Sequence, residues 1–342
     1  MSLDKKGVSV IVCCYNSASR LPETLRHLAL QIVPSDIKWE VIIVNNGSRD
    51  NTVDVASSEW AKYNNNDSIK FQIVDQPIPG LSFAREMGVI TAEYEYLIFC
   101  DDDNWLYDDY IKVSFDAMEE CTTCGIMGGH GIAKPEVEPP VWFDMYSSYY
   151  ATGSQSMRNG IMSGNSPYVY GAGAVIKKTI FRQLKNINFE ILATDRLNEK
   201  LSSGGDVELC YAVKLLGYDI GYNDDLKFFH FIPENKLSNH YILELTYQMG
   251  YCNILHRPYF WLLNPMLPKF KRTFIWTALA ITNIYLIALM RSFKRQDPLN
   301  KFISNVNVKH TKGHIKALLN LNWQIEIFYR NLIQKFKVAV TK

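Results

Sequence analysis

The sequence predicts an α/β protein with a mostly parallel sheet flanked by helices, followed by a basic, helical C-terminal extension. In the first hundred residues, short apolar runs alternate with stretches of helical spacing, which is typical of parallel strands joined by crossover helices. Polar clusters directly follow three of these apolar runs. The hydrophobic content of 47% excludes a wholly disordered chain.

The first hundred residues are expected to hold four strands and three helices. The strands are predicted at 8–14, 39–44, 71–74 and 96–100, and the helices at 21–30, 51–63 and 82–90. In open sheets of this kind, ligands bind at the carboxyl ends of the strands. Those ends carry Tyr15-Asn16, Asn45-Asn46 and Asp101-Asp102-Asp103.

After residue 120 the pattern becomes less regular. Residues 121–170 form a looser segment rich in glycine, proline and aromatic side chains. Regular structure is expected again at 171–181, 206–216 (helical) and 220–229. Residues 253–342 are predicted to form basic amphipathic helices, which places a domain boundary at 252/253.

The formal net charge of +1 hides a strong asymmetry along the chain. Residues 1–252 carry 21 Lys and Arg against 33 Asp and Glu, whereas residues 253–342 carry 15 against two. A basic tail on an acidic body indicates an anionic partner, either a membrane surface or a nucleic acid. The aromatic and aliphatic residues of the tail, including Trp276 and Trp323, favour a lipid interface.

The longest uncharged run covers residues 273–290, and its 18 residues lie at the lower limit for a bilayer span. Basic residues flank the run on both sides, so the charge asymmetry that would orient a span is missing. We expect an interfacial or re-entrant helix, with a true span and a buried core helix as alternatives. No secretory signal is expected, because the first seven residues are polar and the apolar run after them is short.

The seven cysteines are few and odd in number, which argues against a disulfide-stapled scaffold. Cys121 and Cys124 form a CxxC pair, but no second pair or His cluster completes a zinc site. We therefore expect reduced thiols, as in a cytosolic protein.

The run Asp101-Asp102-Asp103 is the strongest local signal for chemistry. Adjacent carboxylates repel one another unless a positive charge neutralises them. A hard divalent cation bound to a diphosphate would do so, because Mg²⁺ and Mn²⁺ prefer carboxylate, water and phosphate oxygens. The alternative is a solvated acidic loop that caps a helix beginning near Trp105.

Three other polar residues have both a structural and a chemical interpretation. Asp206 follows two glycines and precedes a helical run, so it is either a helix N-cap or a general base for a hydroxyl. Arg85 would suit a phosphate or a nucleobase, or a surface ion pair with Glu86 or Glu93. His230 is a hydrogen-bonded edge residue unless an acidic metal site lies beside it.

In chain order these pieces resemble the family 2 glycosyltransferases of the GT-A fold, over roughly residues 7–235. The matching segments are VSVIVCCYN, EVIIVNNGSRDNT, GLSFAREMG, YLIFCDDDN, GAGAVIKK, GGDVELCYAVKLLGY and FFH. The stretch 230–233, followed by Lys236 and Tyr241, resembles bacterial members that build surface polysaccharides. The resemblance implies a GT-A domain at 1–252, with a nucleotide-binding half at about 1–120 and an acceptor half at about 121–252.

The resemblance also implies which residues bind the nucleotide. Tyr15, Asn16 and Asn45 would cradle the base, uracil favoured, and the ribose. Arg85 would contact the base or the phosphates, and Asp102 would lie near the ribose or the sugar. Family members commonly carry an aspartate where Asn45 stands.

Metal and catalytic residues follow from the same resemblance. Asp101 and Asp103 match the acidic metal motif for Mn²⁺ or Mg²⁺, and His230 matches a further metal contact. Asp206 matches the catalytic base, with Glu208 as a second-choice base or acceptor-binding group. Aromatic residues between 142 and 170 are candidates for an acceptor groove, with core packing as the alternative.

The implied protein is an inverting, metal-dependent enzyme that moves a sugar from a nucleoside-diphosphate sugar to a glycan or lipid-linked acceptor. We expect it at the cytoplasmic face of the plasma membrane, peripherally bound by residues 253–342, with dimerisation left open and no nucleic acid partner. The alternatives are a nucleotidyltransferase-type enzyme of nucleotide-sugar metabolism and a non-catalytic protein that binds nucleic acid or membrane through its basic tail.

Overall fold

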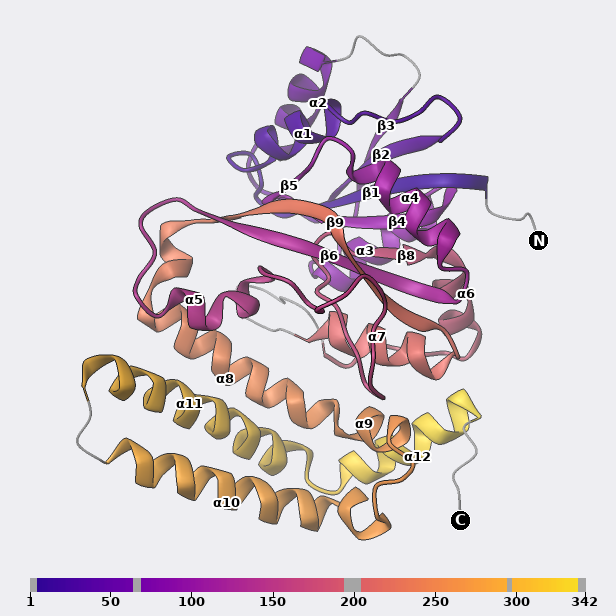
Figure 1. Ribbon diagram of the computed structural model, residues 1–342. Coiled ribbons are helices and arrows are strands. Elements are labelled where there is room, and N and C mark those ends of the chain that lie inside the picture. Colours follow the sequence, from indigo (N-terminus) through magenta and orange to yellow (C-terminus); the bar gives the residue numbers. More distant parts are fainter. Residues whose placement is uncertain (1–4, 64–68, 194–203, 294–296, 338–342) are drawn as a thin grey trace.

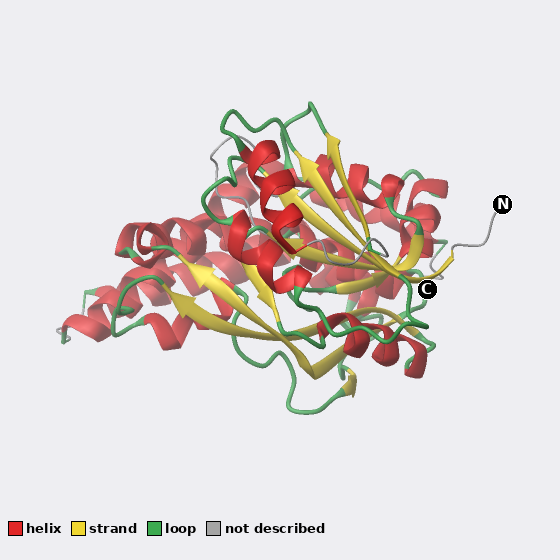
Figure 2. Ribbon diagram, turned by 90° about the horizontal axis from the view of Figure 1, so that it is seen from above, coloured by secondary structure: helices red, strands yellow, loops and turns green. Residues whose placement is uncertain are grey.

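The computed structural model describes residues 5–63, 69–193, 204–293 and 297–337. Within these residues, nine strands form one sheet in the order β3-β2-β1-β4-β8-β6-β9-β5, with β7 paired to β9. The strands are β1 (Lys5–Cys14), β2 (Trp39–Asn45), β3 (Lys70–Asp75), β4 (Tyr94–Asp101), β5 (Asn104–Leu106), β6 (Cys124–Pro135), β7 (Gly160–Ile161), β8 (Val175–Lys177) and β9 (Asp219–Ile232). Helices flank the sheet, as the sequence predicts, and further helices form a separate layer beneath it (Figures 1 and 2).

The helices that cover the sheet come from both halves of the chain. They are α1 (Leu21–Ala29), α2 (Thr52–Tyr63), α3 (Leu81–Thr91), α4 (Tyr110–Glu120), α6 (Lys178–Asn186) and α7 (Gly205–Leu215). Side chains alternate along β1: Val10 and Val12 pack in a cluster with α1, α2 and α4, whereas Ile11 packs in a second cluster with α3, α6 and α7. The sheet is therefore buried on both faces.

The parallel half of the sheet is β3-β2-β1-β4. Cys14 of β1 lies opposite Asn45 of β2, and Cys13 lies opposite Asp101 of β4. The polar residues after these strands therefore meet at one edge, as expected for the carboxyl ends of parallel strands.

The second half of the sheet is mixed rather than mostly parallel, because β8 runs antiparallel to β4 and β6. Strand β6 of this half lies in the segment 121–170, which the sequence predicts to be loose. A Cβ atom on Gly129 or Gly131 would lie 2.1 Å from the carbonyl oxygen of Leu226 or Ala151, so these positions need glycine. Glycine counts against a strand in any propensity pattern, which explains why β6 was missed.

A strand also replaces the helix expected near Trp105. Asn104, Trp105 and Leu106 form β5 and pair with β9, and α4 begins only at Tyr110. Trp105 stacks on Phe231 with 5.5 Å between the ring centroids. This pairing brings His230 of β9 directly opposite Asn104, beside the aspartate run.

Cys121 and Cys124 form a disulfide, so the expectation of reduced thiols is wrong for this pair. Their Cα atoms are 5.3 Å apart, within the range that a disulfide spans. The other five cysteines form no disulfide among the described residues and lie in buried or half-buried positions.

The remaining elements connect the sheet to the C-terminal layer or form that layer. They are α5 (Phe143–Tyr146), η1 (Ser147–Tyr150), η2 (Glu234–Leu237), α8 (Asn239–Leu255), α9 (Arg257–Leu263), η3 (Lys269–Arg272), α10 (Phe274–Ser292), α11 (Pro298–Leu321) and α12 (Gln324–Phe336). Helix α8 runs through the boundary predicted at 252/253. It joins the apolar cluster of Trp142 and Ile232 at one end and packs along α11 (Figure 1).

Helices α8 and α11 approach closely where two glycines face the opposite backbone. A Cβ atom on Gly250 would lie 2.0 Å from the carbonyl oxygen of His310, and one on Gly313 would lie 2.0 Å from that of Tyr247. Overpacked cores cost about 1–3 kcal/mol, so the close crossing depends on both glycines. The C-terminal helices are thus a packed layer of the protein.

Helix α10 lies outermost, separated from the sheet by α8 and α11 (Figure 1). Among the described helices, it is the one whose length and composition would suffice to cross a membrane, and only 17% of that stretch is buried. Its exposed apolar side chains are Ile275, Trp276, Leu279, Ile284, Leu286, Ile287 and Met290. The alternative of a buried core helix is therefore wrong for this segment.

Two buried histidines should make the protein sensitive to acid. Burial lowers the pKa of His314 to about 3 and that of His256 to about 4, below the value of about 6.5 in an unfolded chain. The unfolded chain then binds more protons below that value, so stability is retained at neutral pH and lost as the pH falls. Between pH 7 and pH 5, each histidine should lower the free energy of unfolding by about 2 kcal/mol.

We expect His314→Gln to remove about 2 kcal/mol of this change in the free energy of unfolding, measured by urea unfolding across that range. The exposed His240→Gln serves as the control. An unchanged slope of unfolding free energy against pH in His314→Gln would contradict the assignment.

Candidate active site

The first polar cluster lies where β1 and β2 end. Asn16 adopts a left-handed conformation (φ 50°). Its backbone amide donates to Ser48 Oγ at 3.0 Å, and its side-chain Oδ1 accepts from the Arg49 backbone amide at 2.8 Å. Tyr15 is 44% exposed beside this turn. The Asn16 side chain therefore holds the loop after β2, and Tyr15 is the group of this pair that is open to a ligand.

Asn45 lies beside a carboxylate that the sequence did not reveal as a site residue. Asn45 Nδ2 donates to Asp75 Oδ1 at 2.8 Å, and Asn45 Oδ1 accepts from the Ser48 amide at 3.2 Å. Asp75 ends β3 at the same edge of the sheet. The acidic group missing at Asn45 is thus present on the next strand. The rule that strand ends hold ligands would have found it, because Asp75 directly follows the third apolar run.

Asp102 is buried and turned toward α1. It forms a hydrogen bond with Ser17 Oγ and a two-point ion pair with Arg20, whose Nε and Nη2 lie 3.2 and 2.5 Å from its oxygens. Its carbonyl oxygen accepts from Thr24 Oγ1 at 2.8 Å. Burial raises the pKa of Asp102. This carboxylate fastens α1 to the end of β4, so a direct ribose or sugar contact, as predicted, would require this network to open.

Asp103 lies in a cluster contributed by β5, β9 and η2. Lys236 Nζ is 3.0 Å from Asp103 Oδ2, His230 Nε2 is 3.5 Å from Asp103 Oδ1, and Asn104 Nδ2 donates to the same oxygen at 3.3 Å. The backbone of Lys236 is held by the Tyr150 hydroxyl, which donates to its carbonyl oxygen at 2.9 Å. Arg20 and Lys236 thus neutralise two of the three aspartates. The sequence predicted this neutralising role for a metal ion.

The donor atoms at Asp103 and His230 fit a hard divalent cation. They offer an oxygen and an imidazole nitrogen 3.5 Å apart, and Asp101 lies two residues before Asp103, at the end of β4. Among the residues that the structure describes, the other ring nitrogen of His230 is buried without a hydrogen-bond partner. No group of three His, Cys, Asp or Glu side chains in the described residues forms a complete site. This pattern suits a cation that completes its shell with water and phosphate oxygens.

Asp206 and Arg85 meet at Gly171. Asp206 Oδ2 accepts a hydrogen bond from the Gly171 amide at 2.8 Å, and a Cβ atom on Gly171 would lie 3.0 Å from both Asp206 Oδ2 and Arg85 Nη2. The Arg85 guanidinium also lies over the Phe99 ring, 5.3 Å from its centre. Phe99 lies two residues before Asp101 on β4, so Arg85 and Asp206 belong to the same edge of the sheet as Asp101. Gly204 caps α7, so Asp206 is in the first turn and is not the N-cap.

Glu208 does not face this space. It is 1% exposed, Tyr259 donates to its Oε1 at 2.5 Å, and the Ala193 amide donates to its Oε2 at 2.7 Å. Burial raises the pKa of Glu208. Its position therefore argues against the second-choice role as a base or acceptor contact.

Most of the aromatic residues considered for an acceptor groove are core residues. Trp142, Phe143, Tyr146 and Tyr150 are buried in one cluster with Ile232. Tyr168 is 46% exposed, whereas Tyr149 and Tyr170 are half-buried.

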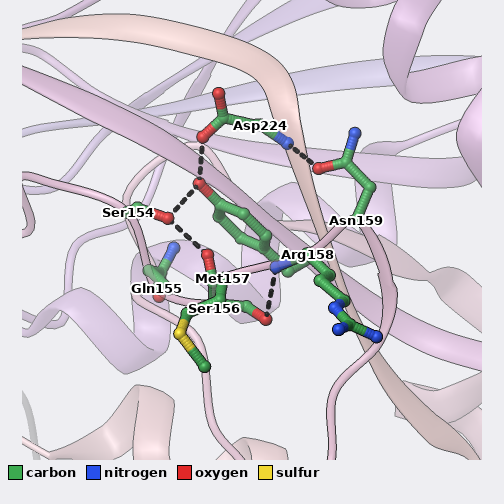
Figure 3. A pocket seen from close by; sticks show the side chains of 8 residues that line it. Ser154, Gln155, Ser156, Met157, Arg158, Asn159 and Asp224 are labelled. Carbon is green, nitrogen blue, oxygen red and sulfur yellow. Dashed lines mark hydrogen bonds between the residues drawn. The ribbon is translucent and has the colours of Figure 1, made fainter.

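A polar pocket of about 680 Å³ lies between residues 154–159 and the first part of β9 (Figure 3). Tyr222, Asp224 and Ser154 are joined at its wall, because the Tyr222 hydroxyl donates to Asp224 Oδ1 at 2.6 Å and lies 2.9 Å from Ser154 Oγ. Gln155 accepts a hydrogen bond from the Tyr170 amide at 2.6 Å, next to Gly171. The hydroxyl, amide and guanidinium groups of this pocket suit a hydroxyl-rich ligand.

Residues 9–185 match the family described as Glycosyl transferase family 2, which is more than half of the chain. The chain belongs to glycosyltransferase family 2. The matched region is accordingly a glycosyl-transferring domain, and the nucleotidyltransferase and nucleic-acid-binding alternatives lose their support.

Relatives and solved structures agree with this assignment. The chain is 33% identical over 110 residues to the putative glycosyltransferase EpsH of Bacillus subtilis, covering 32% of this chain and 30% of that protein. It is 23% identical over 232 residues to the poly-beta-1,6-N-acetyl-D-glucosamine synthase of Staphylococcus epidermidis, covering 67% of this chain and 51% of the relative. The matches thus span about a third to a half of these relatives.

The fold is similar to that of mannosyltransferase PcManGT from Pyrobaculum calidifontis, solved with GDP-Man and Mn²⁺. The TM-score is 0.55 at 18% identity, over 92% of this chain and 87% of that chain. Residues 1–349 of S. aureus TarS, solved with UDP-GlcNAc, give a TM-score of 0.50 at 16% identity, over 91% of both chains. These likenesses confirm the GT-A fold.

Removal of Arg20 should destabilise the aspartate edge. Arg20→Ala would leave the buried Asp102 carboxylate without its cation, and we expect a loss of about 2–3 kcal/mol in the free energy of unfolding, reduced from the value for a fully buried pair because Arg20 is partly exposed. Arg26→Ala, on the same helix, breaks an exposed pair with Glu23 and should cost below about 1 kcal/mol. Equal losses in urea unfolding of the two variants would contradict this assignment.

Proposed function

We propose that the protein is an inverting, metal-dependent glycosyltransferase that uses a nucleoside-diphosphate sugar, with a UDP-sugar favoured. Its acceptor is a glycan or lipid-linked glycan in cell-surface polysaccharide synthesis. The observation that carries this proposal is the meeting of Asp206 and Arg85 at Gly171, beside the strand end with Asp101 and Asp103. The names of several relatives, which include a polysaccharide synthase, support the acceptor class.

In this proposal, each charged group has a separate task. Asp206 takes the proton from the acceptor hydroxyl, which then attacks the anomeric carbon as the bond to the diphosphate breaks. A single displacement of this kind inverts the anomeric configuration. Arg85 binds the phosphates or the base, and Lys236 exchanges Asp103 for a diphosphate oxygen. Asp101, Asp103 and His230 would hold Mn²⁺ or Mg²⁺, which would supply charge neutralisation for the departing diphosphate.

We expect Asp206→Asn to lower kcat by about 100-fold or more, because loss of a general base typically costs two to four orders of magnitude. The measurement is release of the nucleoside diphosphate across a panel that includes UDP-GlcNAc, UDP-galactose and GDP-mannose with Mn²⁺. Asp103→Asn should abolish the turnover that depends on Mn²⁺. The exposed Asp225→Asn is the control. Normal turnover in Asp206→Asn would rule out this base, and an anomer-retained product, resolved by NMR, would rule out inversion.

We further propose that α10 binds the cytoplasmic face of the plasma membrane peripherally. Its exposed apolar side chains lie between Lys269, Lys271 and Arg272 on one side and Arg291 on the other. An apolar face between basic ends suits a helix that lies in the interface of an anionic bilayer.

Leu279→Glu combined with Leu286→Glu should therefore reduce sedimentation with phosphatidylglycerol vesicles by about 10-fold or more, because two charges would enter the acyl region. Leu279 and Leu286 are 63% and 52% exposed. The matched control is Ile90→Glu with Val141→Glu, at exposed positions away from α10. Unchanged sedimentation of the α10 variant would refute membrane binding. Retention of the wild type in membranes after alkaline carbonate extraction would favour a span over an interfacial helix.

A further inference from the structure

Helix α7 has one side at the active site and the other in the C-terminal helices. Asp206 points to Gly171, with 2.8 Å between its Oδ2 and the Gly171 amide nitrogen. Glu208 follows two residues later, so on a helix its side chain points roughly to the opposite side. The rotation of the first turn of α7 therefore sets both contacts together.

Both oxygens of Glu208 have a fixed donor. The Tyr259 hydroxyl of α9 donates to Oε1 at 2.5 Å, and the Ala193 amide donates to Oε2 at 2.7 Å. A carboxylate held at both oxygens leaves the helix little freedom to turn. The first turn of α7 is thereby fastened from the side that faces away from the active site.

Tyr259 itself has no room to move. It is fully buried, and its ring packs against Tyr211 of α7, Phe328 of α12 and Phe189, with centroids 6.1, 5.6 and 6.4 Å away. The position of its hydroxyl is thus set by α9 and α12. The hydrogen bond from Tyr259 to Glu208 therefore makes the orientation of α7 depend on the position of the C-terminal helices.

A buried carboxylate is a costly way to join two helices. An apolar pair of similar size often stabilises a protein as well or better, whereas a charged hydrogen bond fixes direction. A second contact acts on the same turn: a Cβ atom on Gly204, the N-cap of α7, would lie 2.9 Å from Cε1 of His256. Packing and hydrogen bonding from the C-terminal helices thus converge on the turn that holds Asp206.

We propose that Tyr259 is a positioning residue for sugar transfer: through Glu208 it sets the rotation of the first turn of α7 and keeps Asp206 against Gly171. This inference rests on the proposed role of Asp206 as the base. The C-terminal helices then contribute to the chemical step, in addition to any contact with a membrane.

The test is Tyr259→Phe, which removes only the hydroxyl. We expect kcat to fall about 10-fold with the donor KM nearly unchanged, because displacement of a catalytic group by about 1 Å costs up to two orders of magnitude. The assay uses the nucleotide sugar with the highest turnover in the panel above. Hydrogen exchange at the Gly171 amide, measured by mass spectrometry on a peptide that contains it, should become faster, because this amide loses its bond to Asp206. Unchanged exchange at Gly171 would overturn the proposal.

Tyr96→Phe is a matched control. Tyr96 is also buried and donates to a glutamate, Glu119, at 2.6 Å, but it lies on β4 about 16 Å along the strand from Asp101. We expect normal kcat and normal Gly171 exchange in Tyr96→Phe. Its loss of melting temperature should be the smaller of the two, because Glu119 is partly exposed and keeps its ion pair with Lys6. An equal fall of kcat in the two variants would show that Tyr259 acts only through the general stability of the protein.

The double variant Glu208→Leu/Tyr259→Phe separates positioning from stability. In Tyr259→Phe the Glu208 carboxylate keeps only the Ala193 amide as a donor. The double variant removes this carboxylate, so the melting temperature should recover toward that of the wild type while kcat stays low. Recovery of kcat together with melting temperature would show a purely structural contact and overturn the proposal. Full turnover in Asp206→Asn would instead refute the proposed base, whereas the exchange measurement at Gly171 reports on the geometry in either case.

Discussion

Charge neutralisation at the end of β4 is the constraint on which the site depends. Three adjacent carboxylates follow a buried strand, and Asp102 and Asp103 are almost fully buried. Like charges this close raise the free energy of the folded state unless cations lie beside them. Arg20 and Lys236 are those cations, and they come from the N-cap of α1 and from η2 after β9. The two halves of the chain are therefore tied together at the point where the chemistry is proposed.

The same constraint explains why β5 and β9 have their positions. The pairing of β5 with β9 places His230 opposite Asn104 and leads the chain into η2, so β9 contributes an imidazole and η2 contributes a cation to Asp103. On the other side, the turn at Gly171–Gly173 pairs with Phe99 of β4 and brings the Asp206 contact to the same edge. β8 runs antiparallel to β4 and β5 runs antiparallel to β9, so both begin at this edge and bring the Gly171 turn and the Asn104–His230 pairing to it. The antiparallel strands of the second half thus serve the site.

The sequence predicted what local patterns determine and missed what distant segments determine. Apolar runs and the polar residues after them located β1 to β4, and these polar residues do share one edge. The strand β6 was missed because its glycines are required by the backbones of Leu226 and Ala151. The burial of Glu208 depends on Tyr259, about fifty residues away in the chain, and no spacing rule connects them. Asp75 was within reach of the strand-end rule and was overlooked.

The C-terminal helices join two properties that the sequence analysis treated as separate. Their outer helix, α10, presents an apolar face to the surroundings, and their inner helix, α9, places Tyr259 against Glu208 of α7. A truncation at residue 257 would remove both the apolar face and the hydroxyl on Glu208. Loss of activity in such a truncated protein could not then be ascribed to lost membrane contact. Point substitutions on α10 and at Tyr259 act on the two properties one at a time, because α8 and α11 lie between α10 and the sheet.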